Sequence, residues 1–199
     1  MTHYLYLVRH GEHMDAEHGL EDGPLSSRGR RQAELLADRL SGVPLDVVWH
    51  SPLERAAETA RAVAERLPAV TPEPSSLLFD CIPTGPVAGM PSVYEAFFGA
   101  VTEADIDAGR AQMSDAVSEF LVRKNDAHEL LITHNFVIGW FVREVLDAPE
   151  WRWMTINQAH CGLTVLAQRP GRPWVLVSHN DLSHLPMELR TGLPETPPV

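Results

Sequence analysis

Short apolar segments alternate with amphipathic segments of helical period, and this alternation constrains the fold more than any other feature of the chain. Apolar runs at residues 4–8, 46–49 and 129–133 have the length and composition of buried strands. Helical spacing of apolar residues predicts helices at 27–40, from Ser51 to about residue 67, after Thr102, and after a cap at Asn135. Strands separated by helices form βαβ units, so we expect a mostly parallel sheet with helices on both faces.

The last two apolar runs, residues 162–168 and 174–178, are joined by a short turn rich in proline and glycine. Such a connection predicts an antiparallel hairpin at one edge of the sheet. Ser51-Pro-Leu-Glu54 fits a helix N-terminus with Ser51 as the cap, and Thr102 with Asp105 fits the same capping box. The predicted fold class is therefore α/β: a three-layer α/β/α arrangement with a mostly parallel sheet and an antiparallel edge hairpin.

A chain of 199 residues, 44% of them hydrophobic, is long enough to form one α/β domain with its own core. We assign residues 1–192 to this domain and expect the proline-rich residues 193–199 to be a disordered tail. The first residues do not resemble a signal peptide, and no apolar run approaches the roughly 20 residues that span a bilayer. The two cysteines, Cys81 and Cys161, form no CxxC motif and predict no disulfide framework. These features favour a cytoplasmic location.

The charge balance limits the expected partners. Lysine and arginine total 16 against 27 aspartates and glutamates, which gives a net charge of −11. Such a chain lacks the cationic surface that nucleic acids and anionic membranes attract, so neither is an expected partner. A small anionic ligand still fits, because a few arginines in one cleft can dominate the local field. The sequence does not specify an oligomeric state.

Cationic and imidazole side chains follow each predicted strand. Arg9 and His10 come directly after the first strand, and Arg55 lies in the first turn of the helix after the second. His134 follows the third strand and His179 follows the last. Open α/β sheets bind ligands at the carboxyl ends of their strands, so we expect these side chains to meet at one edge. Two arginines beside helix N-termini predict an anion site, most plausibly for a phosphoryl group.

These residue types favour phosphoryl transfer through a histidine. A neutral imidazole can attack phosphorus and form a phosphohistidine, which divides one difficult displacement into two easier ones. Arg9, Arg55 and a protonated His134 would stabilise the charge on the transferring oxygens, so no metal or cofactor is required. A carboxylic acid would protonate the leaving oxygen and then take a proton from the attacking water.

The segment Leu7-Val-Arg-His-Gly-Glu12, directly after the first strand, resembles the signature of the histidine phosphatase superfamily, also called phosphoglycerate-mutase-like. Three further segments match in order, and the similarity spans nearly the whole chain: Leu25-Ser-x-x-Gly29-x-x-Gln32-Ala33, Ser51-Pro-Leu-Glu-Arg55-Ala-Ala-Glu-Thr59 and Thr133-His134-Asn135. The resemblance implies that His10 is the nucleophile of a phosphomonoesterase and that Arg9, Arg55 and His134 form the phosphate pocket.

The general acid is assigned through the compact branch of the family, which resembles phosphoglycerate-mutase-like protein phosphatases. In that branch a glutamate lies in the middle loop, and the matching stretch here, Leu78-Phe-Asp80-Cys-Ile-Pro83, places Asp80 at its position. Aspartate is one methylene shorter, so Glu95, the next loop carboxylate, is the alternative. Residues 157–164 and 179–191 also resemble this branch, which makes His179 a further candidate for the phosphate pocket.

Other functions remain as alternatives. A phosphoglycerate-type mutase would return the phosphoryl group to its substrate, but the loop at 68–98 is short and poor in basic residues. A metal-dependent hydrolase would use His10, His13, Asp15 and His18, although this spacing is not that of a zinc helix. A non-catalytic module would bind phosphate without turnover. The expected substrate is a small phosphate ester or a phosphoprotein.

Overall fold

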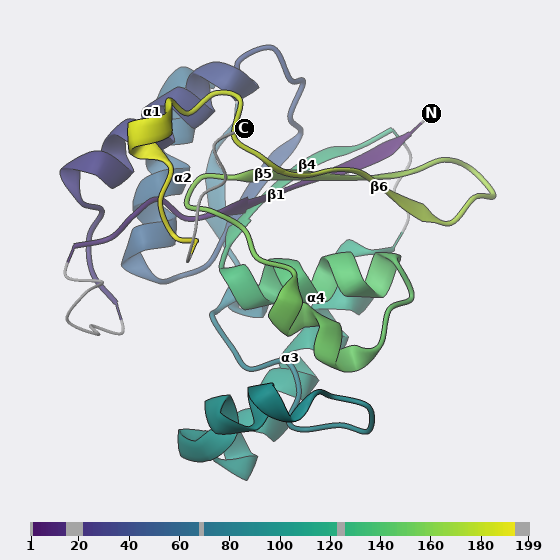
Figure 1. Ribbon diagram of the computed structural model, residues 1–199. Helices are drawn as coiled ribbons and strands as arrows, with labels where there is room; N and C mark the ends of the chain where they lie inside the picture. Colours follow the sequence, from purple (N-terminus) through teal and green to yellow (C-terminus); the bar gives the residue numbers. More distant parts are fainter. Residues whose placement is uncertain (1, 15–21, 68–69, 123–125, 194–199) are drawn as a thin grey trace.

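The computed structural model describes residues 2–14, 22–67, 70–122 and 126–193. Within them, six strands form one mixed sheet in the order β3-β2-β4-β1-β5-β6 (Figure 1). The strands are β1 (His3–Arg9), β2 (Val47–His50), β3 (Pro72–Pro74), β4 (His128–Thr133), β5 (Leu163–Gln168) and β6 (Trp174–Asp181). The helices are α1 (Ser27–Leu40), α2 (Glu54–Arg66), α3 (Glu103–Phe120) and α4 (Asn135–Val145). Short 3-10 helices cover Ser76–Leu78, Ser92–Ala100, Glu150–Thr155 and Met187–Leu189.

The sheet is parallel from β3 through β2 and β4 to β1, and antiparallel from β1 through β5 to β6. The predicted α/β class with an antiparallel edge hairpin is therefore confirmed. The sequence did not predict that β5 also pairs antiparallel with β1, nor the short edge strand β3. β3 contains two prolines, which an edge strand tolerates because one side of it makes no ladder hydrogen bonds.

The two faces of the sheet carry separate cores. Alternate side chains of β1 point to opposite faces: Tyr6 and Val8 pack with α1 and α2, whereas Leu5 and Leu7 pack with α3 and α4. Figure 1 shows α1 and α4 on opposite sides of the sheet. Helical periodicity accounts for this packing, because the apolar stripes of the helices at 27–40 and 103–120 are the buried ones.

Two glycines allow the first turn of α1 to pack against the loop that follows β1. A Cβ on Gly11 would lie 2.7 Å from the carbonyl oxygen of Gly29, and a Cβ on Gly29 would overlap the carbonyl oxygen of Glu12. Ser26 caps α1 by accepting from the Gly29 amide at 3.0 Å, and its hydroxyl donates to the Glu12 carboxylate at 2.8 Å. These contacts fix the loop that begins with His10.

Two predicted caps are wrong. Leu53, not Ser51, is the N-cap of α2, and the backbone amide of Glu54 donates to both carboxylate oxygens of Asp22 at 3.0 Å. The carboxylate that covers this helix end comes from 32 residues earlier, which local sequence cannot show. His134 is the N-cap of α4, and the Asn135 side chain contacts residues 157 and 158 instead. The capping box of Thr102 and Asp105 forms as predicted.

No helix among the described residues is long and apolar enough to cross a membrane. Of the predicted tail, residues 194–199 lie outside the described residues, as do Asp15 and His18 of the alternative metal site. The assignment of residues 1–192 to one domain stays a prediction.

Candidate active site

His10 is held at the carboxyl end of β1 in one tautomer. The side chain is 3% exposed, and its Nδ1 lies 2.7 Å from the carbonyl oxygen of Gly11. A carbonyl only accepts, so Nδ1 carries the proton and Nε2 keeps its lone pair. Arg55 Nε donates to that lone pair at 3.2 Å. Desolvation, reinforced by His134 and Arg9, lowers the pKa of His10 well below 6.5, so the ring is neutral at pH 7 and able to attack an electrophile.

Arg55, at the start of α2, links the other groups of the site. Its guanidinium lies 3.2 Å from Asp22, 3.4 Å from Asp80 and 3.4 Å from Nδ1 of His134. The side chain is 5% exposed, so these charge-assisted contacts form in a poorly solvated cleft. Thr59, one turn further along α2, donates to the Arg55 carbonyl at 2.7 Å and accepts from the Gly11 amide at 3.0 Å. The matched segment 51–59 thus joins α2 to the loop after His10.

His134 follows β4 and is 1% exposed. Its Nδ1 accepts from Arg55, so Nε2 carries the proton and donates to the Ser51 hydroxyl at 2.9 Å. Desolvation, with Arg55 and Arg9 nearby, lowers the pKa of His134 well below 6.5. The ring of His134 is therefore neutral at pH 7, which differs from the protonated His134 that we expected. Ser51, expected to be a helix cap, instead orients this ring.

Arg9 keeps its charge although it is partly buried. Its Nη1 donates to the carbonyl oxygens of Gln158 and Gly192 at 2.9 and 2.7 Å. Desolvation lowers the pKa of Arg9 to about 10, which still leaves it cationic at neutral pH. Its Nε is buried and has no hydrogen-bond partner among the described residues. A buried donor of this kind is costly unless a ligand satisfies it, and an anion is the natural acceptor.

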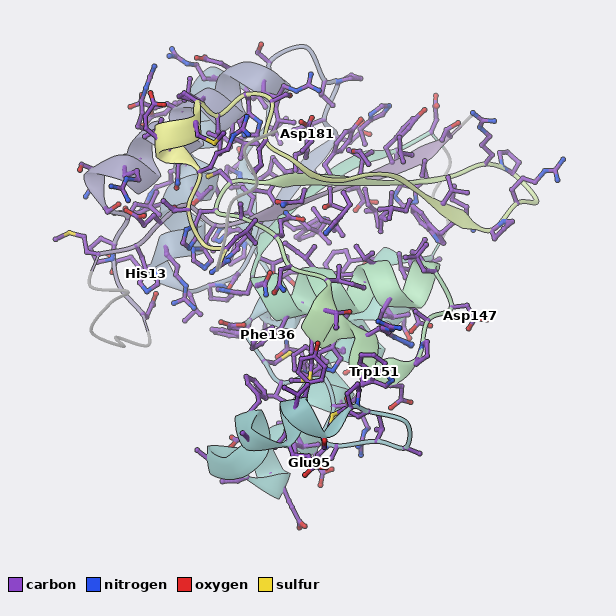
Figure 2. The ribbon with its side chains drawn as sticks, in the orientation of Figure 1. His13, Glu95, Phe136, Asp147, Trp151 and Asp181 are labelled. Atoms are coloured by element: carbon purple, nitrogen blue, oxygen red, sulfur yellow. The ribbon has the colours of Figure 1, made fainter. Side chains whose placement is uncertain are left out.

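Asp80 lies beside the arginine and imidazole groups, and Glu95 does not. The Asp80 carboxylate is 3.4 Å from Arg55 and 3.7 Å from Nδ1 of His134, with 44% of its side chain exposed to the cleft. Desolvation by the cleft walls raises the pKa of Asp80 despite the opposing effect of Arg55 and Arg9. Glu95 is exposed at the end of the molecule remote from His13 (Figure 2). The geometry therefore favours Asp80 over Glu95 as the acid.

His179 lies within β6 and does not follow the last strand as predicted, because that strand extends to Asp181. It belongs to a different hydrogen-bond network. Its Nε2 is 3.1 Å from the Asn157 carbonyl oxygen, and its Nδ1 is 3.1 Å from the Thr164 hydroxyl. Neither partner is one of the predicted phosphate ligands. A phosphate contact by His179 stays a prediction.

The sequence does not single out His160 as a residue of the site. It is 6% exposed, and its ring centre lies 5.4 Å from that of His10. Desolvation, with Arg9, His13 and Arg55 nearby, lowers the pKa of His160 well below 6.5. The available signal was its place just before β5, because a strand antiparallel to β1 begins at the edge where β1 ends.

A cavity of about 560 Å³ lies beside Arg55 and Asp80. Apart from Arg55, its charged lining residues are the carboxylates Asp80 and Asp105. The rest of the lining is mainly apolar: Leu53, Phe79, Cys81, Ile82, Ala108, Gly109, Gln112 and Phe136. This cavity suits the leaving group of a phosphate ester better than a second anionic group, because carboxylates repel anions.

Residues 5–80 and 90–182 match the sequence profile of the histidine phosphatase superfamily (branch 1). The chain belongs to this superfamily. The predicted family is confirmed. The four segments lie within the matched residues, and the fold brings Arg9, His10, Arg55 and His134 together at one edge.

The chain is similar to serine/threonine-protein phosphatases named Pgam5, mitochondrial. It is 31% identical to that of Caenorhabditis briggsae over 91% of this chain, and 29% identical to that of Mus musculus over 93%. It spans only about 64–65% of the length of these relatives. The expected cytoplasmic location is contradicted, because these relatives are named mitochondrial. Composition did not report the compartment.

Solved structures of the same fold include Bacillus stearothermophilus YhfR, with a TM-score of 0.73 and 24% identity over 91% of this chain and 98% of that one. Another is a putative alpha-ribazole-5'-P phosphatase from Escherichia coli, with a TM-score of 0.72 and 20% identity over 90% of this chain and 96% of that one. These similarities establish the phosphoglycerate-mutase-like arrangement of the sheet and helices.

Proposed function

We propose that this protein is a phosphomonoesterase that works through a covalent phosphohistidine on His10, without a metal ion or cofactor. The observation that carries the proposal is the state of the His10 ring. Gly11 holds the proton on Nδ1, and Nε2 presents its lone pair to the Arg55 guanidinium at 3.2 Å. A phosphoryl group bound by that guanidinium would have its phosphorus in front of the nucleophile.

In the first step, Nε2 of His10 forms a bond to phosphorus while the bond between phosphorus and the ester oxygen breaks. Protonated Asp80 donates its proton to that oxygen, which leaves as an alcohol. Arg9 and Arg55 offset the negative charge on the three non-bridging oxygens. In the second step, water attacks phosphorus, Asp80 accepts the water proton, and the bond to Nε2 breaks. Phosphate is released and both groups regain their starting states.

The cavity that would hold the leaving group favours hydrolysis over mutase chemistry. A phosphoglycerate-type mutase has to hold a phosphorylated carboxylic acid, which needs cations beyond the phosphate pocket. The cavity beside Asp80 offers apolar side chains and the carboxylates Asp80 and Asp105 instead. The substrate is therefore a phosphate ester with an uncharged leaving group. A phosphoprotein is the preferred candidate, because the relatives are named serine/threonine-protein phosphatases.

Hydrolysis of p-nitrophenyl phosphate, with and without a chelator, tests this proposal. We expect chelator-resistant turnover in the wild type. Turnover abolished by the chelator would indicate a metal-dependent hydrolase. No turnover, together with a rise in melting temperature on adding vanadate, would indicate a phosphate-binding module. A dependence on a bisphosphorylated primer would indicate a mutase.

A further inference from the structure

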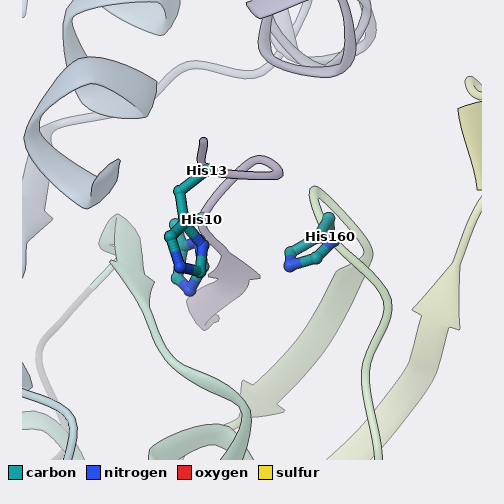
Figure 3. Close-up of side chains that lie close together, drawn as sticks. All are labelled: His10, His13 and His160. Atoms are coloured by element: carbon teal, nitrogen blue, oxygen red, sulfur yellow. The ribbon is translucent and has the colours of Figure 1, made fainter. Parts of the chain in front are cut away.

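We propose that His10, His13 and His160 form a zinc-binding site and that zinc bound there blocks the nucleophile. The binding itself depends only on the geometry of the three rings, whereas the inhibition rests on the proposed function of His10. Figure 3 shows the three imidazoles converging from two loops, one after β1 and one before β5.

The three side chains have the geometry of a ligand set that needs little rearrangement. One ring nitrogen of each lies within 4.8 Å of those of the other two. Tetrahedral zinc with bonds of 2.0–2.1 Å to nitrogen requires about 3.3–3.4 Å between ligand atoms. The ring nitrogens therefore need to approach one another by at most about 1.5 Å, which small side-chain rotations supply. Three histidines with one open position is a known zinc arrangement.

Two of the rings are already oriented by hydrogen bonds to the ring nitrogen that would point away from the zinc ion. His10 is held through Nδ1 by the Gly11 carbonyl oxygen, and Nδ1 of His160 lies 3.0 Å from the Thr191 hydroxyl. Thr191 is fixed in turn by Gln32 at 2.9 Å. Hydrogen bonds of this kind position histidine ligands in metal sites, because they leave the opposite nitrogen directed at the ion. The backbone of His13 is anchored by a bridge to Leu25.

The charge around the cluster both allows and limits metal binding. Burial lowers the pKa of His10 and of His160, so both rings are neutral and can coordinate at pH 7. Arg9 and Arg55 oppose a dication, and Arg55 Nε occupies the His10 lone pair. Zinc therefore has to displace the Arg55 contact, and an anion at its fourth position would offset the arginine charge. Imidazole ligands and a tetrahedral site favour zinc over magnesium or calcium.

The consequence for activity follows from the shared lone pair. Nε2 of His10 is the atom that attacks phosphorus in the proposed mechanism, and it is the His10 nitrogen available to a metal. One lone pair cannot serve both, so zinc and the phosphoryl group exclude each other. His13 has no role in the proposed mechanism. A substitution of His13 therefore tests metal binding without removing a catalytic group.

Isothermal titration calorimetry with zinc chloride, paired with activity measured over the same zinc concentrations, tests this site. We expect one zinc per chain and a progressive loss of activity that EDTA reverses. His13→Asn should keep the basal activity and weaken both zinc binding and zinc inhibition by on the order of tenfold or more, since it removes a ligand. His128→Asn, a histidine at the start of β4 far from the cluster, should behave as wild type in both assays.

Equal zinc affinity in the wild type and His13→Asn would overturn the site. Zinc binding that leaves the activity unchanged would overturn the claim that zinc blocks the nucleophile. If the protein lacks turnover altogether, calorimetry still decides whether the site exists, so failure of the proposed function is distinguishable from failure of this inference.

Discussion

Replacement of Asp80 by asparagine tests the assignment of the general acid. The substitution is nearly isosteric, and the amide oxygen can still accept from Arg55, which lies 3.4 Å from the carboxylate. The amide cannot donate an acidic proton to the leaving group. General acid catalysis contributes about 10²–10⁴-fold, which corresponds to roughly 3–5 kcal/mol in the activation barrier.

The loss should depend on the leaving group. An alkyl phosphate, whose alkoxide is a poor leaving group, should lose about 10²–10⁴-fold in kcat/KM when Asp80 becomes asparagine. p-Nitrophenyl phosphate should lose about tenfold or less, because nitrophenolate leaves without a proton. The pH profile provides a second readout. The raised pKa of Asp80 keeps the acid protonated to higher pH, so the alkaline fall in activity on the alkyl ester should disappear in Asp80→Asn.

Steady-state kinetics on both esters measures this difference, and Glu95→Gln is the matched control. The Glu95 variant should retain wild-type rates on both substrates, because its side chain is exposed and lies at the end of the molecule remote from His13. Equal losses on the two esters in Asp80→Asn would refute the role of Asp80 as proton donor. A selective loss in the Glu95 variant would transfer the role to that residue.

Two further predictions concern the scaffold and the buried histidines. Gly29→Ala should lower the free energy of unfolding in urea by about 1–3 kcal/mol, because the added methyl group meets a backbone carbonyl oxygen. Gly42→Ala is the control and should not destabilise the protein, because its added methyl group meets no atom within 4 Å. Equal stability of the two variants would contradict the close packing of α1. The free energy of unfolding should fall as the pH is lowered from 7.5 to 5. The unfolded chain protonates its histidines near pH 6.5, whereas burial keeps His10, His134 and His160 neutral in the folded state. A constant urea midpoint over this range would show that these rings are not held neutral.

Much of the site could be predicted because parallel strands end at one edge of the sheet. Arg9 ends β1 and His10 follows it, Arg55 follows β2 and His134 follows β4. Adjacent parallel strands therefore bring these residues together whatever the detailed packing. The alternation of strand patterns with helix patterns along the chain predicted the layers, because the apolar face of each strand or helix has to be covered by another element.

The missed features depend on contacts between distant parts of the chain. His160 reaches the site only because β5 is antiparallel to β1, and the hairpin signal did not say which strand it would join. Asp22 covers the N-terminus of α2 from 32 residues away, which removes the need for a local serine cap. Ser51 is then left to orient His134. Local patterns carry no information about such pairings.

The most direct test of the mechanism is to trap the intermediate on His10. The wild type is mixed with a radiolabelled phosphate ester, quenched in alkali, digested and analysed by mass spectrometry, alongside His10→Ala. We predict an acid-labile, alkali-stable phosphoryl group on the peptide that contains His10, and neither label nor turnover in a His10→Ala variant that remains folded. Full turnover in His10→Ala, or a phosphoryl group on another residue, would contradict the phosphohistidine mechanism.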